Sequence, residues 1–413
     1  MGKTRRYFLK SGMAPAFALS ATAGRSAFAL GGPVDERAEP QIDAVDRLHS
    51  SFDPWVEVHV ANLRANATAV HDRVKRPILA VIKNNGYGAG VANVARALEP
   101  LASIAGFAVV KLHEAHALRD AAVRKPIVLM GPLDSTEVVD AVRRQISLMV
   151  YTPIVTTLER AAAAIARPVD IHVCVDTGLG RVGVPHTEAL EVIRPLARAK
   201  GIHIAGMMMT FTEDAAFDRE QLRRFAALSD ALRAAGISVG TRHAASSYTL
   251  FQHPDAALDM VRPGMVLYGI YPEPAFRTAG ILDLKPAIAL KARVAYVKQL
   301  RSGDSAGYNR AYTAKAPVWI ATLPVGHADG LPRGAANGGR VRIGGARYPI
   351  VASISASHTI VEIGPDRRVE IGDEATVFDW TDGSRPEDLA AACGASVYDL
   401  TMHLNPMMPR RVV

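Results

Sequence analysis

The chain has little cysteine: Cys174 and Cys393 are the only two among 413 residues. Two cysteines so far apart do not supply the closely spaced ligands of a zinc site, and the sequence leaves open whether they form one disulfide. His113 and His116 lie three residues apart in a helical pattern, which a solvated helix face explains better than metal binding. We therefore expect no metal site.

The chain also lacks a surplus of positive charge once its first 29 residues are set aside. Five of its 48 basic residues lie there with no acidic residue, so the rest carries 43 basic groups against 40 acidic ones. Aromatic residues make up 6% of the chain and form no stripe interleaved with basic residues. This composition predicts neither nucleic acid nor an anionic membrane surface as a partner.

Long hydrophobic runs are missing as well. The apolar run near the N-terminus, residues 12–24, is rich in small residues and is followed at once by Arg25. Because a transmembrane helix needs about 20 apolar residues, no stable membrane anchor is predicted.

The same segment has the order of a targeting signal. A basic start containing Arg5 and Arg6 precedes the apolar run, and a small-x-small triplet ends at Ala29. This order predicts a signal peptide over residues 1–29, and the arginine pair favours the twin-arginine route over the general secretory one. We expect a periplasmic protein with a flexible lead-in over residues 30–50.

From residue 78 onward, short apolar runs alternate with helical patterns, which is typical of parallel βα units. Eight such runs would close a (β/α)₈ barrel of the TIM type. The expected strands cover residues 78–82, 104–110, 126–130, 146–150, 169–175, 202–209, 239–245 and 260–267. The expected helices cover residues 91–98, 111–122, 136–144, 154–166, 187–200 and 216–235.

After about residue 285 the pattern changes to strands separated by Gly and Asp turns, which indicates a second, mostly β domain. The fold class is therefore α/β, with a barrel over residues 51–285 and a β domain over 286–413. A further strand is expected over 55–60, and the sequence leaves open whether it belongs to the barrel or to the β domain. The expected strands of the second domain cover residues 289–297, 318–323, 340–343, 348–353, 359–363 and 374–378.

A lysine, Lys83, ends the first barrel strand and a glycine-rich loop follows it. The C-terminal ends of barrel strands form the catalytic face. A lysine that is partly desolvated there has a lowered pKa and an available amine, which suits a covalent link to an aldehyde cofactor. A solvated lysine at a strand end is the alternative that this pattern alone leaves open.

The seventh and eighth strands add a phosphate site to that lysine. Ser246 and Ser247 end the seventh, and Arg262-Pro263-Gly264 lies on the eighth. Barrels commonly bind phosphate in the loops after these two strands. A reactive lysine opposite a phosphate site suits pyridoxal 5'-phosphate, which also needs a partner for its ring nitrogen.

Five sequence blocks, in order across roughly residues 53–380, resemble those of the alanine racemase family. They are Val81-x-Lys83-x-Asn85-Gly86-Tyr87-Gly88-x-Gly90, Asp176-Thr177-Gly178-Leu179-Gly180-Arg181-Val182-Gly183, Arg262-Pro263-Gly264 with Tyr268-Gly269, Gly307-Tyr308 with Tyr312, and Gly326-His327-Ala328-Asp329-Gly330. The resemblance implies a pyridoxal-phosphate-dependent amino-acid racemase that works as a homodimer with shared active sites.

The resemblance also implies roles for individual residues. Lys83 would carry the cofactor and act as one acid/base group, and Tyr308, reaching across a dimer interface, would act from the opposite face of the substrate Cα. Racemisation needs such an opposed pair, since one group removes the α-proton and the other returns one. Arg262 would meet the pyridine nitrogen without readily protonating it, and Arg181 would lie near the substrate carboxylate. The phosphate would be held by Tyr87, Ser247, Gly264 and Met265.

The chain departs from the family at several of these positions. Cys174 stands where many relatives have a carbamylated lysine that orients the equivalent of Arg181, and a buried cysteine cannot replace it. Thr210 and Ser246 stand where relatives usually have histidine and asparagine. The family's phosphate-binding tyrosine near the C-terminus has no clear counterpart within residues 400–410.

The substrate entrance departs further. His327 replaces the usual tyrosine, and Ala356 and Ser357 replace methionine and aspartate. Smaller, uncharged residues predict a wider entrance that admits side chains larger than the methyl group of alanine. Steric exclusion matters here because apolar pockets discriminate by only about 1–3 kcal/mol per methylene.

Two other functions stay open on the sequence. A decarboxylase with the same two-domain plan would share the lysine and the phosphate site, although its expected Cys-Glu-x-Gly-Asp-like block is not found in the β domain. A non-catalytic protein that only binds the cofactor or a ligand would tolerate the substitutions at the site.

Overall fold

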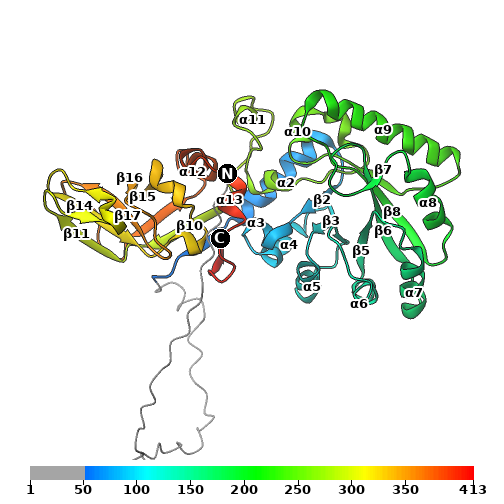
Figure 1. Ribbon diagram of the computed structural model, residues 1–413, viewed down its shortest axis with the longest axis horizontal. Helices are drawn as coiled ribbons and strands as arrows, with labels where there is room; N and C mark the ends of the chain where they lie inside the picture. The colour runs from blue at the N-terminus through cyan, green and yellow to red at the C-terminus, as the bar shows by residue number, and fades with distance from the viewer. Residues whose placement is uncertain (1–51) are drawn as a thin grey trace, which may run out of the picture. The chain divides into compact units, whose positions relative to one another are not determined.

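The computed structural model describes residues 52–413 (Figure 1), and the predicted signal peptide and lead-in lie outside this range. The strands β2 to β9 form a barrel, and β1 (Trp55–Val58) with the strands from β10 (Ile288–Arg293) onward forms a β domain. The barrel strands are β2 Ile78–Val81, β3 Ile104–Val109, β4 Ile127–Leu129, β5 Ile146–Val150, β6 Val169–Asp176, β7 Val184–Pro185, β8 Ile202–Met208 and β9 Thr241–His243. The helices around them are α2 Val60–Val74, α3 Lys83–Tyr87, α4 Val91–Leu98, α5 Leu112–Asp120, α6 Val138–Arg143, α7 Val155–Ile165, α8 Ala189–Arg198, α9 Ala215–Ala234, α10 Thr249–Gln252 and α11 Pro274–Thr278.

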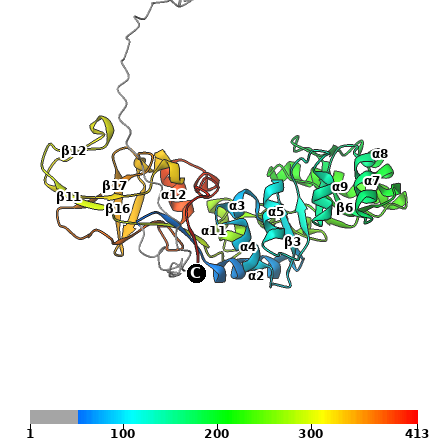
Figure 2. The ribbon, with the colours of Figure 1, turned by 90° about the horizontal axis from the view of Figure 1, so that it is seen from below.

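The barrel sheet is parallel, as the alternation of strands and helices predicts. In the described chain its hydrogen-bonded order is β2-β3-β4-β5-β6-β8-β9, with β7 paired to β6. Helices such as α5 and α7 run along the outside of the strands (Figures 1 and 2). The strands are buried on both faces and therefore read in sequence as short continuous apolar runs.

A short segment, not a full eighth strand, closes the barrel. Met260 and Val261 bridge to β9 and β2, and Pro263 accepts a backbone hydrogen bond from β2 at 2.9 Å. The strand predicted over 260–267 is therefore too long. Proline has no N–H with which to continue the ladder, and the chain turns into the 3-10 helix η2, Met265–Tyr268.

The strand predicted over 55–60 belongs to the β domain. It is shorter, β1 Trp55–Val58, and pairs with β10 on one side and β19 on the other. His59 ends it and caps helix α2, whose Asn62 N–H donates to the His59 Nδ1 at 3.2 Å. The sequence pattern missed α2, which links the β domain to the barrel.

The β domain is built on one large sheet. Within the described residues its order is β11-β14-β17-β16-β15-β18-β10-β1-β19. The single strand predicted over 289–297 is two strands, because the pairing partners change: β10 pairs with β1 and β18, and β11 pairs with β14. The elements are β10 Ile288–Arg293, β11 Tyr296–Leu300, β12 Ser305–Ala306, β13 Tyr312–Thr313, β14 Val318–Leu323, β15 Arg340–Ile343, β16 Ala346–Val351, β17 Thr359–Gly364, β18 Glu374–Phe378, α12 Pro386–Cys393, α13 Val397–Thr401 and β19 Arg410–Val412. This arrangement confirms the predicted fold class, a TIM-like barrel followed by a mostly β domain.

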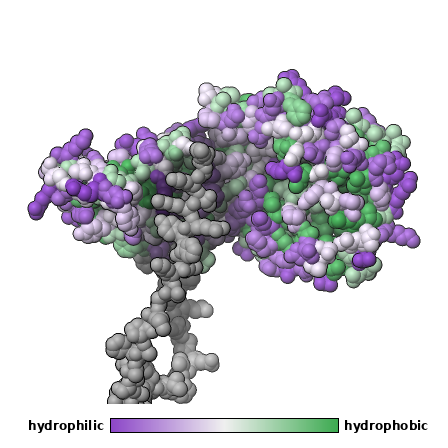
Figure 3. Space-filling model, viewed as in Figure 1, coloured by the Kyte–Doolittle hydropathy of each residue, from purple (hydrophilic) through white to green (hydrophobic). Residues whose placement is uncertain are grey.

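Apolar side chains fill the barrel, and in the view of Figure 3 they also gather on its surface more than on that of the β domain. Inside the barrel, Met149, Cys174 and Met208 form a buried cluster flanked by Met130 and Tyr151. We call Met130, Met149, Cys174 and Met208 the sulfur cluster. Among the described helices, none is long and apolar enough to cross a bilayer.

Candidate active site

The chain turns sharply where β2 ends. From Asn84 to Tyr87 the backbone is left-handed, with φ between 53° and 62° at every residue. Left-handed backbone is tolerated by glycine and asparagine and is costly for most other residues. The Asn-Asn-Gly sequence therefore suits this turn, and the turn sets the position of Lys83 at its start.

A buried carboxylate holds the turn. Glu114 of α5 is 3% exposed and accepts from the backbone N–H of Asn85 at 2.7 Å. It also accepts from Val110 and Lys111, at 3.3 and 3.2 Å. One side chain thus ties the Lys83 turn to the end of β3.

A cavity of about 540 Å³ opens at this end of the barrel. The structure brings seven of the predicted site residues together in its wall, and the sulfur cluster contributes to the same wall. The seven are Lys83, Tyr87, Arg181, Ser247, Arg262, Gly264 and Met265.

The environment of the cavity favours a neutral amine on Lys83. Burial lowers the pKa of Lys83, the charge of Arg181 lowers it further, and Glu114 partly offsets the change. Burial also raises the pKa of Tyr87, whose ring lies 4.8 Å from that of Tyr268. The lysine is thus prepared as a nucleophile or base, and the tyrosine as a hydrogen-bond donor.

Behind the cavity, a buried chain of hydrogen bonds supports Arg262. Its guanidinium contacts His243 Nδ1 at 3.0 Å and donates to the carbonyl of Met209 at 2.6 Å. His243 Nε2 in turn lies 2.9 Å from His172 Nδ1. Because a guanidinium can only donate, His243 accepts from Arg262 at Nδ1 and donates from Nε2 to His172.

The region predicted to bind phosphate is assembled from two loops. Gly264 N–H donates to the Ser247 hydroxyl at 2.9 Å. A Cβ atom added to Gly264 would lie 2.2 Å from the Tyr87 hydroxyl oxygen, so only glycine lets the three groups converge. Hydroxyl and backbone N–H donors close together suit an anion.

Arg181 has no side-chain counterpart to the carbamylated lysine of relatives. Cys174 lies buried with its thiol 3.7 Å from the Val182 carbonyl, and burial raises its pKa to about 11. Asp176 instead shapes the loop by accepting from the N–H groups of Gly178 and Gly180. Cys174 and Cys393 are both free thiols. Within residues 52–413, no cluster of three or more His, Cys, Asp or Glu could hold a metal.

Four predicted residues lie in the β domain and do not line the Lys83 cavity of their own chain. Tyr308 is 73% exposed. His327 and Ala356 are neighbours, because the backbone N–H groups of His327 and Ala328 donate to Ser355 and Ala356. Ser357 follows in the same exposed loop. The predicted entrance residues therefore cluster together, apart from the lysine.

Tyr398 and Glu213 are among the residues of the cavity wall that the sequence did not predict. Tyr398 of α13 lies 6.1 Å from the Tyr87 ring, and burial raises its pKa to about 12. It lies two residues before the segment in which the C-terminal tyrosine was sought. Glu213, in the loop after β8, also lines the cavity and carried no distinctive sequence signal.

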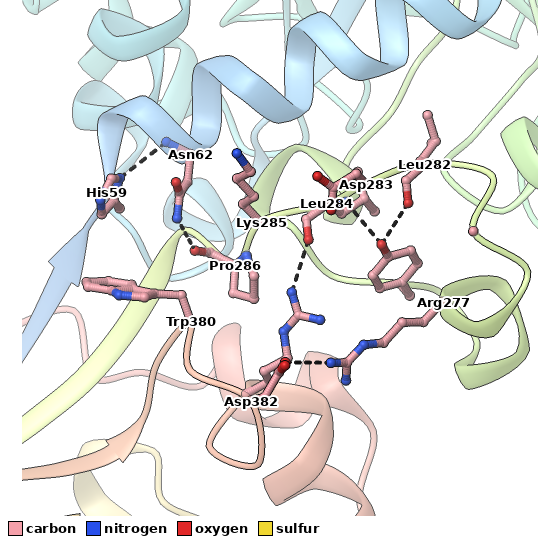
Figure 4. A pocket seen from close by; sticks show the side chains of 13 residues that line it. His59, Asn62, Arg277, Leu282, Asp283, Leu284, Lys285, Pro286, Trp380 and Asp382 are labelled. Carbon is pink, nitrogen blue, oxygen red and sulfur yellow. Dashed lines mark hydrogen bonds and ion pairs between the residues drawn. The ribbon is translucent and has the colours of Figure 1, made fainter. Parts of the chain in front are cut away.

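A second cavity, of about 620 Å³, lies where α2 begins (Figure 4). Two of its polar side chains are already paired: Arg277 with Asp382 at 2.7 Å, and Asn62 with the Pro286 carbonyl, to which it donates at 2.8 Å. None of the predicted site residues lines it. The Lys83 cavity is therefore the candidate active site.

Comparison with known proteins agrees with this choice. Residues 58–272 match the family described as alanine racemase, N-terminal domain, and residues 287–412 match its C-terminal domain. The chain belongs to the alanine racemase family. The alanine racemase of Desulforamulus reducens is 34% identical over 368 residues, covering 86% of this chain and 98% of its own.

Solved alanine racemases share the fold. The enzyme from Streptomyces lavendulae has a TM-score of 0.83 at 28% identity, covering 88% of this chain and 98% of its own. That of Clostridium difficile has a TM-score of 0.82 at 28% identity, covering 87% and 96%. Membership makes the protein a pyridoxal-phosphate-dependent isomerase that racemises amino acids, as the resemblance implied, and gives the decarboxylase alternative no support.

The cavity of this alanine racemase family member fits pyridoxal phosphate. Lys83 offers an amine of lowered pKa, and the Ser247, Gly264 and Tyr87 donors meet at one point. Arg262 is held from behind by His243 and Met209, so its orientation is fixed before any ligand binds. These are the groups that would hold the aldehyde, the phosphate and the ring nitrogen.

Proposed function

We propose that this protein is an exported homodimeric racemase that interconverts the L and D forms of free amino acids, alanine and larger ones. One observation carries the proposal. Lys83 lines a cavity together with the residues predicted to bind phosphate and the buried Arg262, while the Tyr308 side chain is exposed in the β domain. A second copy of the chain would bring the two together.

The bound cofactor would supply an electron-withdrawing ring that acidifies the Cα–H bond of the amino acid. The Nζ of Lys83 would take or return the α-proton on one face, and the Oη of Tyr308 of the partner subunit would do so on the other. Arg181 would attract the substrate carboxylate. Because Arg262 does not readily give up a proton, it would leave the ring nitrogen unprotonated and limit competing reactions.

Two features support a substrate range beyond alanine. His327, Ala356 and Ser357 replace bulkier or charged residues at the predicted entrance. The sulfur cluster adds a flexible, polarisable wall to the cavity, and methionine side chains adapt readily to different shapes. This wall would adapt its shape to larger apolar side chains.

The test is solvent deuterium exchange at Cα, measured for L-alanine, L-serine, L-methionine, L-lysine and L-arginine. We expect the wild type to exchange the proton and form the D isomer, and Lys83→Ala to do neither, because the acid/base amine is gone. No exchange by a cofactor-loaded wild type would leave a protein that only binds. Exchange of alanine alone would contradict the broad range.

Export is proposed from the N-terminal sequence, which precedes the described residues. A periplasmic racemase would form D-amino acids outside the cytoplasm. Cell fractionation with N-terminal sequencing should find the mature protein in the periplasm, beginning after Ala29. Replacing both Arg5 and Arg6 by lysine should hold it in the cytoplasm with its racemase activity intact. A wild type that stays uncleaved in the cytoplasm would refute export but not the chemistry.

A further inference from the structure

The loop after β8 is fixed by two buried side chains of α9. Asp218, 1% exposed, accepts from the hydroxyl and the N–H of Thr212, at 2.9 and 3.1 Å, and from the N–H of Glu213 at 3.1 Å. Gln221 accepts from Thr212 N–H at 2.9 Å and donates to the Thr210 carbonyl at 3.1 Å. The backbone that carries Glu213 is therefore held rigidly at the cavity wall.

Glu213 is held in a strained conformation. Its φ is 69°, a region that glycine or asparagine occupies at lower cost and that ordinary residues avoid. Strained residues of this kind cluster at ligand-binding and catalytic positions. Glycine would adopt this φ without strain, so a glutamate here has a cost in backbone energy.

The Glu213 carboxylate lacks a counterion. Glu213 is the one acidic residue among the described residues that line the cavity. Within residues 52–413, its carboxylate forms no hydrogen bond or ion pair. Glu213 is exposed at the edge of the cavity, and partial burial together with the like charges of Asp218 and Glu273 raises the pKa of its carboxyl. A cation that entered the cavity would find an unpaired carboxylate in its wall.

The basic ionisable groups of the cavity wall lie elsewhere in it. Lys83 and Arg262 lie where the cofactor would bind, and Arg181 lies at the exposed mouth. Arg181 and Arg262 are cations and Lys83 is an amine of lowered pKa, so none of the three can attract a positively charged substrate side chain. Glu213 can.

We propose that Glu213 is a specificity-determining residue that binds the cationic side chain of a basic amino acid, such as lysine, ornithine or arginine. The proposal rests on the proposed racemase function and names a substrate class for the same site. The carboxylate would select substrates by their charge, in addition to the selection by size at the entrance.

The test uses substrate pairs that differ in charge at similar size: L-lysine against L-norleucine, and L-arginine against L-citrulline. The kcat/KM for D-isomer formation is measured for the cofactor-loaded wild type, Glu213→Gln, Glu213→Asp and the control Glu191→Gln. Glu191 lies on α8 with a side chain 75% exposed, so its loss tests for a general effect of charge.

We expect the wild type to prefer the cationic member of each pair. Glu213→Gln should lower kcat/KM for lysine and arginine by about tenfold, the size of one modest charge interaction. It should change kcat/KM for norleucine, citrulline and alanine by less than about twofold, because uncharged side chains gain little from a carboxylate. Glu213→Asp should keep most of the preference, and Glu191→Gln all of it.

An unchanged lysine-to-norleucine ratio in Glu213→Gln, in an enzyme that still racemises alanine, would overturn the role of Glu213 and leave the racemase function standing. Loss of all substrates in parallel would mean that Glu213 supports the loop and does not select substrates. If the wild type racemises no amino acid, the proposed function itself has failed, and this inference with it.

Discussion

Two buried histidines connect the barrel core to the cavity. His243 and His172 are 0% and 6% exposed and continue the hydrogen-bond chain that starts at Arg262. A Cβ atom on Gly206 would lie 2.4 Å from the His172 ring, so glycine is needed there to make room for it. Both histidines are neutral in this hydrogen-bond network, because one nitrogen of each ring must accept a hydrogen bond.

These histidines should make the protein sensitive to acid. Burial, helped by the charge of Arg262, lowers the pKa of His172 to about 4 and that of His243 well below its ordinary 6.5. Between pH 6.5 and about 4 the unfolded chain therefore binds more protons than the folded one. The contribution of these neutral histidines to the free energy of unfolding should be complete above pH 6.5. Below pH 6.5 the free energy of unfolding should fall by up to about 1.4 kcal/mol per pH unit for each histidine.

Urea unfolding across this pH range measures the effect. Carboxylates contribute to acid sensitivity as well, so the informative quantity is the difference between variants. His172→Gln should flatten the pH dependence, because one titrating group is gone, while replacement of the exposed His358 by glutamine should not. Equal slopes in all three proteins would show that His172 does not titrate in this range.

At the scale of single residues, the sequence predicted best where parallel strands end. Lys83, Ser247 and Arg262 follow different strands, yet a barrel brings all strand ends to one face, so their meeting could be expected. Tyr398 could not be placed, because it comes from the other domain and no periodic pattern relates the two. Glu213 looked like any solvated loop carboxylate until its surroundings were known.

At the scale of elements, the left-handed turn of α3 is the most strained part of the site. Left-handed backbone costs about 1–2 kcal/mol for most non-glycine residues and less for asparagine, and the turn holds Asn84, Asn85 and Tyr87 in this conformation. Glu114 offsets this cost by satisfying three backbone N–H groups. The turn and the start of α5 therefore act as one unit.

Removing the carboxylate should destabilise this unit. Glu114→Ala would leave three N–H donors unsatisfied, so we expect a loss of about 3 kcal/mol or more in the free energy of unfolding, together with lower cofactor occupancy. Glu114→Gln should lose less, because one oxygen still accepts. Chemical denaturation and the absorbance of bound cofactor measure the two effects.

Glu137 supplies the matched control. It accepts a single backbone N–H, from Asp134 at 3.1 Å, on the exposed surface, so Glu137→Ala should cost less than about 1 kcal/mol. If Glu114→Ala were as mild as this control, the turn would be stable without its carboxylate.

Helices and strands could be predicted where the apolar periodicity was strong. They could not be predicted where the geometry of the chain determined where an element begins or ends. Helix α4 matches the predicted residues 91–98, because its apolar positions are well spaced. Helix α2 was missed, since its buried face is partly alanine and asparagine and it follows β1 after one residue. The eighth strand was overestimated because apolar residues continue past Pro263 into a 3-10 helix.

At the scale of the whole molecule, the proposed dimer makes a direct prediction. If each site combines Lys83 of one subunit with Tyr308 of the other, Lys83→Ala and Tyr308→Ala are each inactive alone. Unfolding and refolding them together should restore about a quarter of wild-type activity, because half of the dimers are mixed and each of those has one intact site.

The mixing experiment also has an opposite result. If both groups acted within one chain, every site in the mixture would lack one of them and no activity would return. Refolding wild type with Lys83→Ala controls for losses in the procedure. Light scattering on the same samples establishes that dimers are present.

The pairing of β1 with β19 has a consequence for how the protein is made. Val413 exchanges backbone hydrogen bonds with Val58 and Val60, at 2.9 Å each, and residues 410–412 lie beside β1. β1 and β19 are far apart in the sequence, so β1 is synthesised long before its partner. The barrel could form while synthesis continues, but the large sheet cannot be completed until residues 410–413 have been added. The pairing of β1 with β19 is therefore among the last contacts of the described residues to form.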